Sequence, residues 1–326
     1  LKKFPMNKGS LVHDDYFTLF QNNNIINKNY IITQIQPSSI DLTLSEECYE
    51  IRASFLSPKC AIRNKLKEII KKKINLNNRY IFKKNTTYLV KLNEKLNLTN
   101  DIFGKCNPKS STGRLDIFCR TILDFSGEYE KIPLNYIGEI FLEVTSRSFD
   151  IEFQKGDSLN QMRLVYCNHD YIDDKKLRDF HKNDSIIFDQ FGNKNIADIS
   201  SGLKISVDLN KNKTSAYTAK KKTPILKFNS LRNHKVNDFW DTITTVDGLL
   251  IIKPGKFYIL RSKQKIRIPK NMAGEMIPYD TAIGDFRVHY AGFFDPGFGD
   301  PSGSYAVLEV KTNEVPFILE DGQVIA

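Results

Sequence analysis

The hydrophobic positions along this chain repeat mostly with the period of a β-strand. Ile40, Leu42 and Leu44 alternate with polar residues after a polar turn over 34–39, which predicts a half-buried strand. Further short apolar runs follow at intervals of about ten residues with turn signals between them, a spacing typical of a β-sandwich or barrel. These predicted strands are 80–82, 88–92, 117–123, 137–144, 149–153 and 162–166.

Helical periodicity is confined to a few short segments. The pattern over 11–24 is weakly helical. Within 64–74, apolar residues recur at helical spacing with lysines between them, which predicts an amphipathic surface helix. Residues 171–200 are rich in Asp, Lys and Asn, and we expect a linker there, with one helix over 174–181. The chain is therefore predicted to be mainly β, with a few short helices.

The sequence contains two copies of one unit. The matching segments lie in the same order in both copies, with few gaps between them. They are 85–90 with 255–260 at a shift of 170, 141–144 with 307–310 at a shift of 166, and 40–42 with 207–209 at a shift of 167. We predict a first β-rich domain over 1–170 and a second over 201–326, joined by the linker over 171–200.

Composition describes an ordinary globular chain. Of 326 residues, 40% are hydrophobic and 26% are charged, and no long uninterrupted apolar run predicts a membrane span. The first residues carry no apolar signal core, so we expect a cytoplasmic protein whose first residues are missing or start at an unusual codon. The five cysteines are scattered without a Cys-x-x-Cys pair, which favours reduced thiols and argues against structural zinc.

Neither zinc chemistry nor nucleic-acid binding is indicated. None of the five histidines opens a His-x-Glu sequence followed by Pro-Cys-x-x-Cys, the signature of zinc-dependent deaminases. Much of the net charge of +10 comes from short lysine runs such as 71–73 and 220–222, which are usually solvated. No aromatic and basic residues interleave as they do in single-strand binders, and we expect no nucleic-acid partner.

One segment, 107–115, gathers the donor groups that a phosphate chain requires. It places two adjacent hydroxyls, Ser110 and Ser111, beside Gly113 and Arg114. Hydroxyls, backbone N–H groups and a forked guanidinium all bind phosphate oxygens. Ser-Ser-Thr-Gly is also ordinary turn chemistry, so both interpretations stay open on the residues alone.

Four motifs, in this order, give the chain a resemblance to a known family. They are Ser-Ser-Ile-Asp-Leu at 38–42, Lys-Ser-Ser-Thr-Gly-Arg-Leu at 109–115, His-Tyr-Ala-Gly-Phe-Phe-Asp-Pro-Gly-Phe at 289–298 and Leu-Glu-Val at 308–310. Together they resemble the motifs of dCTP deaminases in the dUTPase-like superfamily, most closely the long duplicated form found in some bacteria. The resemblance covers most of both copies.

The resemblance implies a fold, a substrate and a set of partners. The fold would be a tandem pair of dUTPase-like distorted β-barrels of the jelly-roll type. The substrate would be the small molecule dCTP, with Mg²⁺ held through its triphosphate, no zinc, and no metal held by side chains. The chain would form a homo-oligomer, either a trimer or a pseudo-symmetric assembly of barrels.

The two copies depart from the family pattern in complementary ways. The first keeps the phosphate motif at 110–114 but has Leu-Asp-Phe-Ser-Gly at 123–127 where the family has Asp-Pro-Gly. The second keeps Asp-Pro-Gly at 295–297 and a strand glutamate, Glu309, but has Pro-Tyr-Asp-Thr-Ala-Ile-Gly at 278–284 in place of the phosphate motif. We hypothesise one composite site that takes its phosphate loop from the first copy and its sugar and base pocket from the second.

The reaction implied is replacement of the 4-amino group of cytosine by oxygen. Water attacks C4, and one carboxylate with a raised pKa can move the protons from that water to the ring and the leaving nitrogen. Glu309 is our first choice for that carboxylate, although an exposed Glu on a polar strand face is the plainer interpretation. Glu143 holds the same place in the first copy and is the second choice.

The other roles also follow from the resemblance. Arg114 and Ser111 would hold the phosphates with support from Ser110, and Arg114 would also orient the attacking water. Asp295 would accept a hydrogen bond from the sugar 3′-hydroxyl, although Asp-Pro-Gly is also a plain turn. His289 would line the base pocket, although a lone strand histidine is more often a core residue.

Other functions remain open on the sequence. A dUTPase-type diphosphatase would direct the water to phosphorus, and a bifunctional enzyme would do both reactions. The degenerate half-sites also suit a non-catalytic nucleotide-binding regulator. In the family a C-terminal tail closes over the nucleotide. Because this sequence stops at Ala326, we expect either a truncated tail or a lid supplied by the linker, with Tyr171, Lys175 and Lys176.

Overall fold

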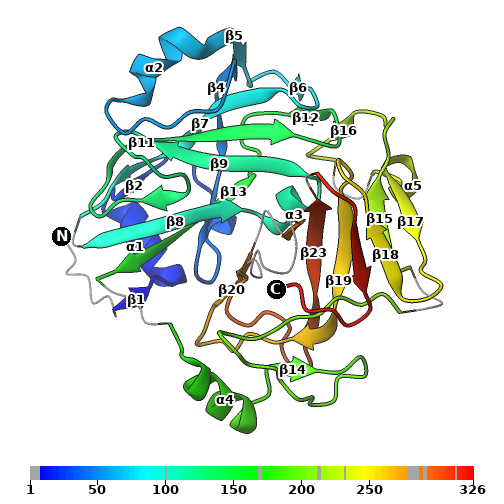
Figure 1. The fold of residues 1–326 in the computed structure, drawn as a ribbon. Helices are drawn as coiled ribbons and strands as arrows, with labels where there is room; N and C mark the ends of the chain where they lie inside the picture. Colours follow the sequence, from blue (N-terminus) through cyan, green and yellow to red (C-terminus); the bar gives the residue numbers. More distant parts are fainter. Residues whose placement is uncertain are drawn as a thin grey trace. The chain divides into compact units, whose positions relative to one another are not determined.

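The computed structural model divides the chain into two compact units, which we describe separately (Figure 1). The first unit comprises Leu1–Asp170 with Thr223–His234, and the second comprises Tyr171–Lys222 with Lys235–Ala326. The structure describes residues 8–99, 101–167, 171–210, 214–230, 233–277, 286–288, 292–312 and 314–326. No helix in these ranges is long and apolar enough to cross a membrane.

The first unit consists of three sheets with short helices at their margins. The strand orders are β1-β13-β8-β10 with β3 on β13, β5-β4-β7-β11-β9 with β2 on β7, and β16-β12-β6. The first sheet contains β1 (Gly9–Ser10), β3 (Ile40–Leu42), β8 (Ile102–Pro108), β10 (Lys131–Ile132) and β13 (Asn160–Tyr166). The second contains β2 (Ile25–Ile26), β4 (Leu44–Ile51), β5 (Ile70–Asn75), β7 (Thr87–Asn97), β9 (Ile117–Leu123) and β11 (Ile137–Ser146). The third contains β6 (Tyr80–Phe82), β12 (Ile151–Phe153) and β16 (Leu226–Lys227), and the helices are α1 (His13–Gln21), η1 (Ile32–Gln34), α2 (Ile62–Ile69) and α3 (Ser110–Gly113).

The second unit repeats this plan with fewer paired residues. Its largest sheet has the order β17-β15-β19-β23-β21 with β14 on β19, and two-stranded sheets pair β18 with β24 and β20 with β22. The strands are β14 (Ile187–Phe188), β15 (Ala216–Ala219), β17 (Trp240–Ile243), β18 (Leu249–Ile252), β19 (Tyr258–Ile266), β20 (Gly274–Glu275), β21 (Phe286–Val288), β22 (Phe293–Phe294), β23 (Ser304–Thr312) and β24 (Phe317–Glu320). The helices are α4 (Asp174–Asn183) and α5 (Val236–Phe239).

The mainly β architecture predicted from the sequence is confirmed. Strands β6 and β9 cover the residues predicted for them, and α1 lies within the weakly helical stretch over 11–24. Within the described residues the pairings form open sheets, and none of them closes into a ring. Residues 171–200 carry α4 and also β14, which pairs with β19 of the second unit.

The predicted helix over 64–74 is wrong in its second half. Helix α2 ends at Ile69, and the next residues form β5, which pairs antiparallel with β4. In this register Ile74 lies opposite Cys48 and is buried, while the three lysines at 71–73 stay exposed on the edge strand. Lysines suit an exposed edge strand as well as the surface of a helix. Pairing with the free edge of β4 therefore makes β5 a strand despite its helical spacing.

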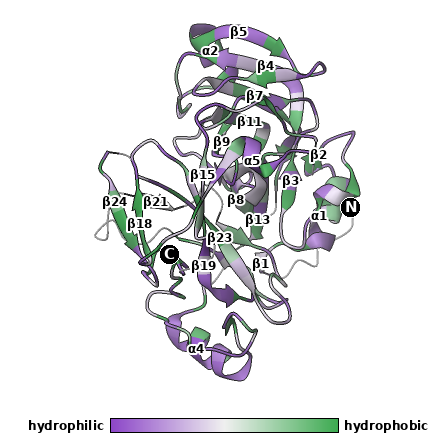
Figure 2. Cartoon of the chain, turned by 90° about the vertical axis from the view of Figure 1, so that its right-hand side faces the viewer, coloured by the Kyte–Doolittle hydropathy of each residue, from purple (hydrophilic) through white to green (hydrophobic). Residues whose placement is uncertain are grey.

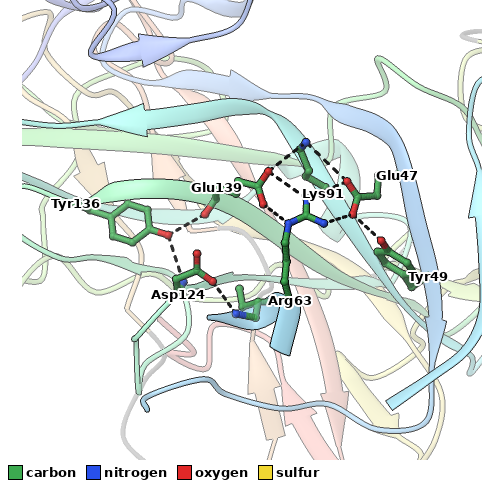
Figure 3. A network of polar contacts seen from close by, with 8 residues as sticks. Glu47, Tyr49, Arg63, Lys91, Asp124, Tyr136 and Glu139 are labelled. Atoms are coloured by element: carbon green, nitrogen blue, oxygen red, sulfur yellow. Dashed lines mark hydrogen bonds and ion pairs between the residues drawn. The ribbon is translucent and has the colours of Figure 1, made fainter. Parts of the chain in front are cut away.

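A network of charges attaches α2 to the sheet beneath it (Figure 3). Arg63 of α2 makes two hydrogen bonds to Glu47 of β4, at 2.9 and 3.1 Å, and two to Glu139 of β11, at 2.7 and 3.1 Å. Lys91 of β7 lies 3.3 Å from Glu139, and the Tyr49 hydroxyl donates to Glu47 at 2.6 Å. Below the network, the buried side chains Ile62 and Leu66 pack α2 against the sheet.

The internal repeat predicted from the sequence is present in the strand register. Glu143 of β11 lies opposite Leu89 of β7, and Glu309 of β23 lies opposite Ile259 of β19. The shifts between these partners, 166 for the glutamates and 170 for their neighbours, are the shifts found in the sequence. The two units are therefore copies of one fold in this region.

The match of 40–42 with 207–209 is wrong by four residues. Leu44 donates its backbone N–H to Asp157, and Val207 does the same to Gln323. These pairs make Leu44 and Val207 equivalent, at a shift of 163, so Asp41 and Asp208 occupy different places. Short apolar alternations of this kind can be matched at more than one shift, and only the hydrogen-bond register fixes the correct one.

Candidate functional site

The phosphate motif of the first unit forms the short helix α3 between β8 and β9. Two side-chain hydrogen bonds attach this segment to neighbouring parts of the first unit. The Thr112 hydroxyl donates to the Leu159 carbonyl at 2.8 Å, and the Ser148 hydroxyl donates to buried Asp116 at 2.6 Å. Lys109, which precedes the helix, forms an ion pair with Asp41 of β3. The segment is therefore a built loop, and the anchors Thr112 and Asp116 were not singled out from the sequence.

The predicted phosphate ligands lie on the outer side of this loop. Ser110, Ser111 and Arg114 are all exposed. Within the described residues, none of the three makes a side-chain hydrogen bond or an ion pair, whereas Thr112 and Asp116 are buried and each makes a side-chain hydrogen bond inside. The hydroxyls of Ser110 and Ser111 and the guanidinium of Arg114 are therefore available to bind an anionic ligand.

In the first unit, the buried Glu143 is already engaged by another side chain. Its Oε1 accepts a hydrogen bond of 2.9 Å from Nη2 of Arg120 on the neighbouring strand β9. The Arg120 guanidinium also donates to Ser54 at 2.8 Å and lies 3.7 Å from the centre of the Tyr129 ring. Arg120 therefore takes one oxygen of the Glu143 carboxylate, and the other, Oε2, is buried without a hydrogen bond among the described residues.

Glu309 occupies the equivalent place in the second unit. It lies on β23 opposite Ile259 and is 4% exposed, so the interpretation of an exposed polar-face glutamate is wrong. Strand β21 pairs with β23 on its other side, with Val288 opposite Val310. The carboxylate of Glu309 is therefore largely withdrawn from water.

The Asp-Pro-Gly segment forms a turn at the end of β22. Phe298 donates its backbone N–H to the Asp295 carbonyl at 3.1 Å, and Gly297 donates to Ile268 at 3.0 Å. Gly297 has φ of +84°, a conformation that glycine adopts without strain. The turn thus has a structural role of its own, and it fixes the backbone at the half-buried Asp295.

Two predicted parts of the site lie outside the described residues. They are His289 and the segment 278–284, which replaces the phosphate motif in the second copy.

A strongly perturbed carboxylate, Glu130, was missed by the sequence analysis. Burial raises its pKa to about 7, although the Thr121 backbone N–H donates to Oε1 at 2.9 Å and opposes that rise. The Glu130 carbonyl accepts from Cys106 of β8 at 2.7 Å, so this residue links β8 to β9. Its sequence context, Gly-Glu-Tyr-Glu-Lys, resembles an exposed charged turn and gives no sign of burial.

Across the described ranges, His, Cys, Asp and Glu side chains form no group of three or more that could hold a metal ion.

Comparison with known proteins places both halves of the chain in one family. Family models of the 2′-deoxycytidine 5′-triphosphate deaminase (DCD) N-terminal and C-terminal domains match residues 7–168 and 173–326. The fold is similar to the crystal structure of 2′-deoxycytidine 5′-triphosphate deaminase from Agrobacterium tumefaciens, with a TM-score of 0.91 and 36% identity. That match covers 98% of this chain and 94% of the other. A search of curated proteins gave no match.

Proposed function

Because the chain belongs to the dCTP deaminase family, a family of hydrolytic deaminases, we propose that it converts dCTP and water to dUTP and ammonia with Glu309 as the general base. The observation that carries this assignment is the burial of Glu309 at the position where the first unit has Glu143 occupied by Arg120. Glu309 also lies in the copy that keeps the Asp-Pro-Gly segment of the family motif.

Glu309 would act by moving protons. It takes one from the water that attacks C4, and the tetrahedral intermediate then loses ammonia after proton transfer to the ring N3 and the leaving nitrogen. A carboxylate kept from bulk water can serve as a base near neutral pH, because desolvation raises the pKa of the carboxyl group. The proposal needs no zinc, in keeping with a sequence that lacks the zinc-deaminase signature.

The remaining groups would bind and orient the nucleotide. The exposed Ser110, Ser111 and Arg114 hold the triphosphate, and Mg²⁺ reaches the site with the phosphate oxygens. Arg114 also orients the attacking water. Asp295 accepts from the 3′-hydroxyl, and His289 lines the base pocket.

The cellular setting belongs to the same proposal. The product dUTP would serve as a precursor of dUMP and dTTP. All five cysteines are free thiols, which supports a reducing compartment, the cytoplasm. We also propose that the working form is a homo-oligomer, with three chains as the family resemblance suggests.

A product assay tests the reaction. The chain is incubated with dCTP and Mg²⁺, and ammonia, dUTP, dUMP and pyrophosphate are quantified against time. Equal amounts of ammonia and dUTP support deamination, and ammonia with dUMP and pyrophosphate would mean a bifunctional enzyme. Pyrophosphate without ammonia would move the chain to the diphosphatase function, and tight dCTP binding without any product would make it a regulator.

A further inference from the structure

The phosphate motif of the first unit lies between two strands that belong to different sheets. Strand β8, which leads into the motif, pairs with β13 and β10, whereas β9, which leads out of it, pairs with β11 at the margin of the second sheet. The two strands lie next to each other in both views (Figure 1, Figure 2), but within the described residues no strand pairing joins them. Their spacing near the motif therefore depends on other contacts.

That spacing matters because the donors of the motif are carried by different strands. Ser110 and Ser111 follow the end of β8, whereas Arg114 comes shortly before the start of β9. Helix α3, which joins them, is only four residues long. The position of the guanidinium relative to the two hydroxyls therefore depends on how β8 and β9 are held together.

Glu130 bridges the two strands. On the side of β9, its backbone N–H donates to the Thr121 carbonyl at 3.2 Å, and its Oε1 accepts from the Thr121 backbone N–H at 2.9 Å. On the side of β8, its carbonyl accepts from the Cys106 backbone N–H at 2.7 Å. These hydrogen bonds join the strand that enters the motif to the strand that leaves it.

In this bridge the Glu130 carboxylate takes the place of a backbone carbonyl. Thr121 is buried, and β9 is an edge strand whose other side is paired with β11. A buried backbone N–H without an acceptor is costly, so the free edge of β9 requires a partner at this residue. Glu130 has φ of +63°, a left-handed conformation that is uncommon for residues other than glycine.

Backbone contacts identify the counterpart of Glu130 in the second unit. Cys106 and Met276 are related by the shift of 170 that defines the repeat. Just as Cys106 donates to Glu130, Met276 donates its backbone N–H to the Gly292 carbonyl, at 2.5 Å. Two residues further along, the pairing of β10 with β8 matches that of β22 with β20. Gly292 therefore holds the place of Glu130.

The second unit thus keeps the backbone half of the bridge and lacks the side-chain half. Gly292 has no carboxylate with which to reach a neighbouring strand. The same unit has Pro-Tyr-Asp-Thr-Ala-Ile-Gly at 278–284 in place of the phosphate motif. The carboxylate bridge is therefore found in the copy that keeps the motif and is missing from the copy that has lost it.

We propose that Glu130 is a positioning residue for the nucleotide phosphates. By tying β8 to β9, it sets the position of Arg114 relative to Ser110 and Ser111. This inference rests on the proposed function, in which these three side chains hold the triphosphate. Glu130 acts through the two strands, and it makes its contacts with their backbone rather than with the substrate.

Steady-state kinetics with dCTP and Mg²⁺ tests the proposal in the variant Glu130→Gly. Glycine already stands at this place in the second unit and adopts a positive φ without strain, so the variant is expected to fold, which circular dichroism checks. We expect its KM for dCTP to rise about 10-fold, the value of one hydrogen bond to a charged group, with a smaller change in kcat. A variant that is merely less stable has fewer folded molecules, which lowers the apparent kcat and leaves the KM unchanged.

Three further variants separate positioning from stability. Glu130→Gln keeps a side-chain oxygen for the Thr121 N–H and is expected to restore most of the wild-type KM. Glu128→Gly removes a carboxylate that is 62% exposed, and Tyr88→Phe removes a buried hydrogen bond elsewhere in the same unit. Both are expected to keep the wild-type KM. An unchanged KM in folded Glu130→Gly, or an equal rise in Tyr88→Phe, overturns the proposal.

Hydrogen exchange, followed by mass spectrometry, tests the same link without turnover. Peptides that cover 107–115 should exchange faster in Glu130→Gly than in the wild type, while peptides that cover β19 of the second unit should not change. If the wild type does not deaminate dCTP, the proposed function fails, and hydrogen exchange still decides whether Glu130 holds the motif. Unchanged exchange over 107–115 in the folded variant overturns the inference in either case.

Discussion

Tyr88 of the first unit and Tyr258 of the second accept the same hydrogen bond at positions 170 residues apart. The Tyr88 hydroxyl accepts from the backbone N–H of Lys83 at 3.1 Å, and the Tyr258 hydroxyl accepts from that of Lys253 at 3.1 Å. Both rings are buried at the start of the central strands β7 and β19. The duplication therefore preserves a side-chain contact as well as a strand pattern.

Removing either hydroxyl is expected to lower the free energy of unfolding by a similar amount. Tyr88→Phe and Tyr258→Phe each leave one backbone donor without its acceptor, which lowers the free energy of unfolding by about 1–2 kcal/mol. Urea denaturation measures the loss. Tyr217→Phe is the control, because Tyr217 is 36% exposed and its hydroxyl makes no hydrogen bond in the described residues. A loss confined to one of the two buried tyrosines would contradict the equivalence.

Glu130 is expected to make the stability of the fold depend on pH. Its pKa of about 7 in the folded chain lies above the ordinary value of 4.5, so the unfolded chain releases this proton first as the pH rises. The folded state then binds more protons, and the free energy of unfolding falls between pH 4.5 and pH 7 and stays level above it. The difference amounts to ~3 kcal/mol at most.

Glu130→Gln removes that slope and keeps an acceptor for Thr121. The variant should match the wild type near pH 4 and exceed its stability near pH 8, as measured by denaturant unfolding at both values. Glu128→Gln, which removes a carboxylate 62% exposed two residues away, controls for the loss of one negative charge. Equal slopes for wild type and Glu130→Gln would show that Glu130 does not titrate as argued.

Arg63 is expected to contribute more than an ordinary surface ion pair. Arg63→Ala removes forked hydrogen bonds to both Glu47 and Glu139, but its side chain is 47% exposed, so the expected loss is only about 1–2 kcal/mol. Arg79→Ala is the control, because Arg79 is 58% exposed and makes only single contacts, an ion pair of 3.4 Å with Glu152 and a hydrogen bond of 3.1 Å to Gln154. Arg79→Ala should leave the free energy of unfolding almost unchanged.

The contribution of Arg63 should also disappear in acid. The hydrogen bonds from Arg63 hold the pKa of Glu139 below its usual value, so this stabilisation is present above about pH 4.5 and is lost as the pH falls through the folded pKa. Unfolding of wild type and Arg63→Ala at pH 7 and at pH 3 gives the comparison. An equal difference at both values would mean that Arg63 acts through packing alone.

Local patterns predicted the strands well, because alternation of apolar and polar residues reports which face is buried. Short runs of β-forming residues between turn signals worked as well, and residues 117–123 form β9 as expected. The same rule failed at β5, where the lysines suit either a helix surface or a strand edge, and only the free edge of β4 decides between them. The match of Asp41 with Asp208 failed likewise, because short alternations do not fix a register.

The phosphate motif could also be located from the sequence. The contacts that anchor this motif, or that engage Glu143, could not. The anchor between Thr112 and Leu159 joins residues 47 positions apart, and the pair of Arg120 with Glu143 requires two strands in register. The enclosure of the half-buried Glu130 likewise depends on its contacts with β8 and β9. Such contacts depend on tertiary packing and leave no periodic signal.

Arg114 is expected to bind the nucleotide through its phosphates. Arg114→Ala should lower kcat/KM for dCTP by about 10–100-fold, the value of one to two charge-assisted hydrogen bonds, and Arg114→Lys should recover only part of it. Steady-state kinetics measures both variants. Arg52→Ala, which removes another exposed cation of the same unit, is the control and should leave the kinetics unchanged. Unaltered kinetics in Arg114→Ala would remove this residue from the site.

The central claim is that Glu309, and not its counterpart Glu143, is the base. The most direct measurement is the rate of ammonia release from dCTP with Mg²⁺ by wild type, Glu309→Gln and Glu143→Gln, normalised to folded protein. We expect Glu309→Gln to lose at least about 100-fold in rate, the usual value of a general base, and Glu143→Gln to keep most of the wild-type rate. Activity that survives in Glu309→Gln and is lost in Glu143→Gln would contradict the account.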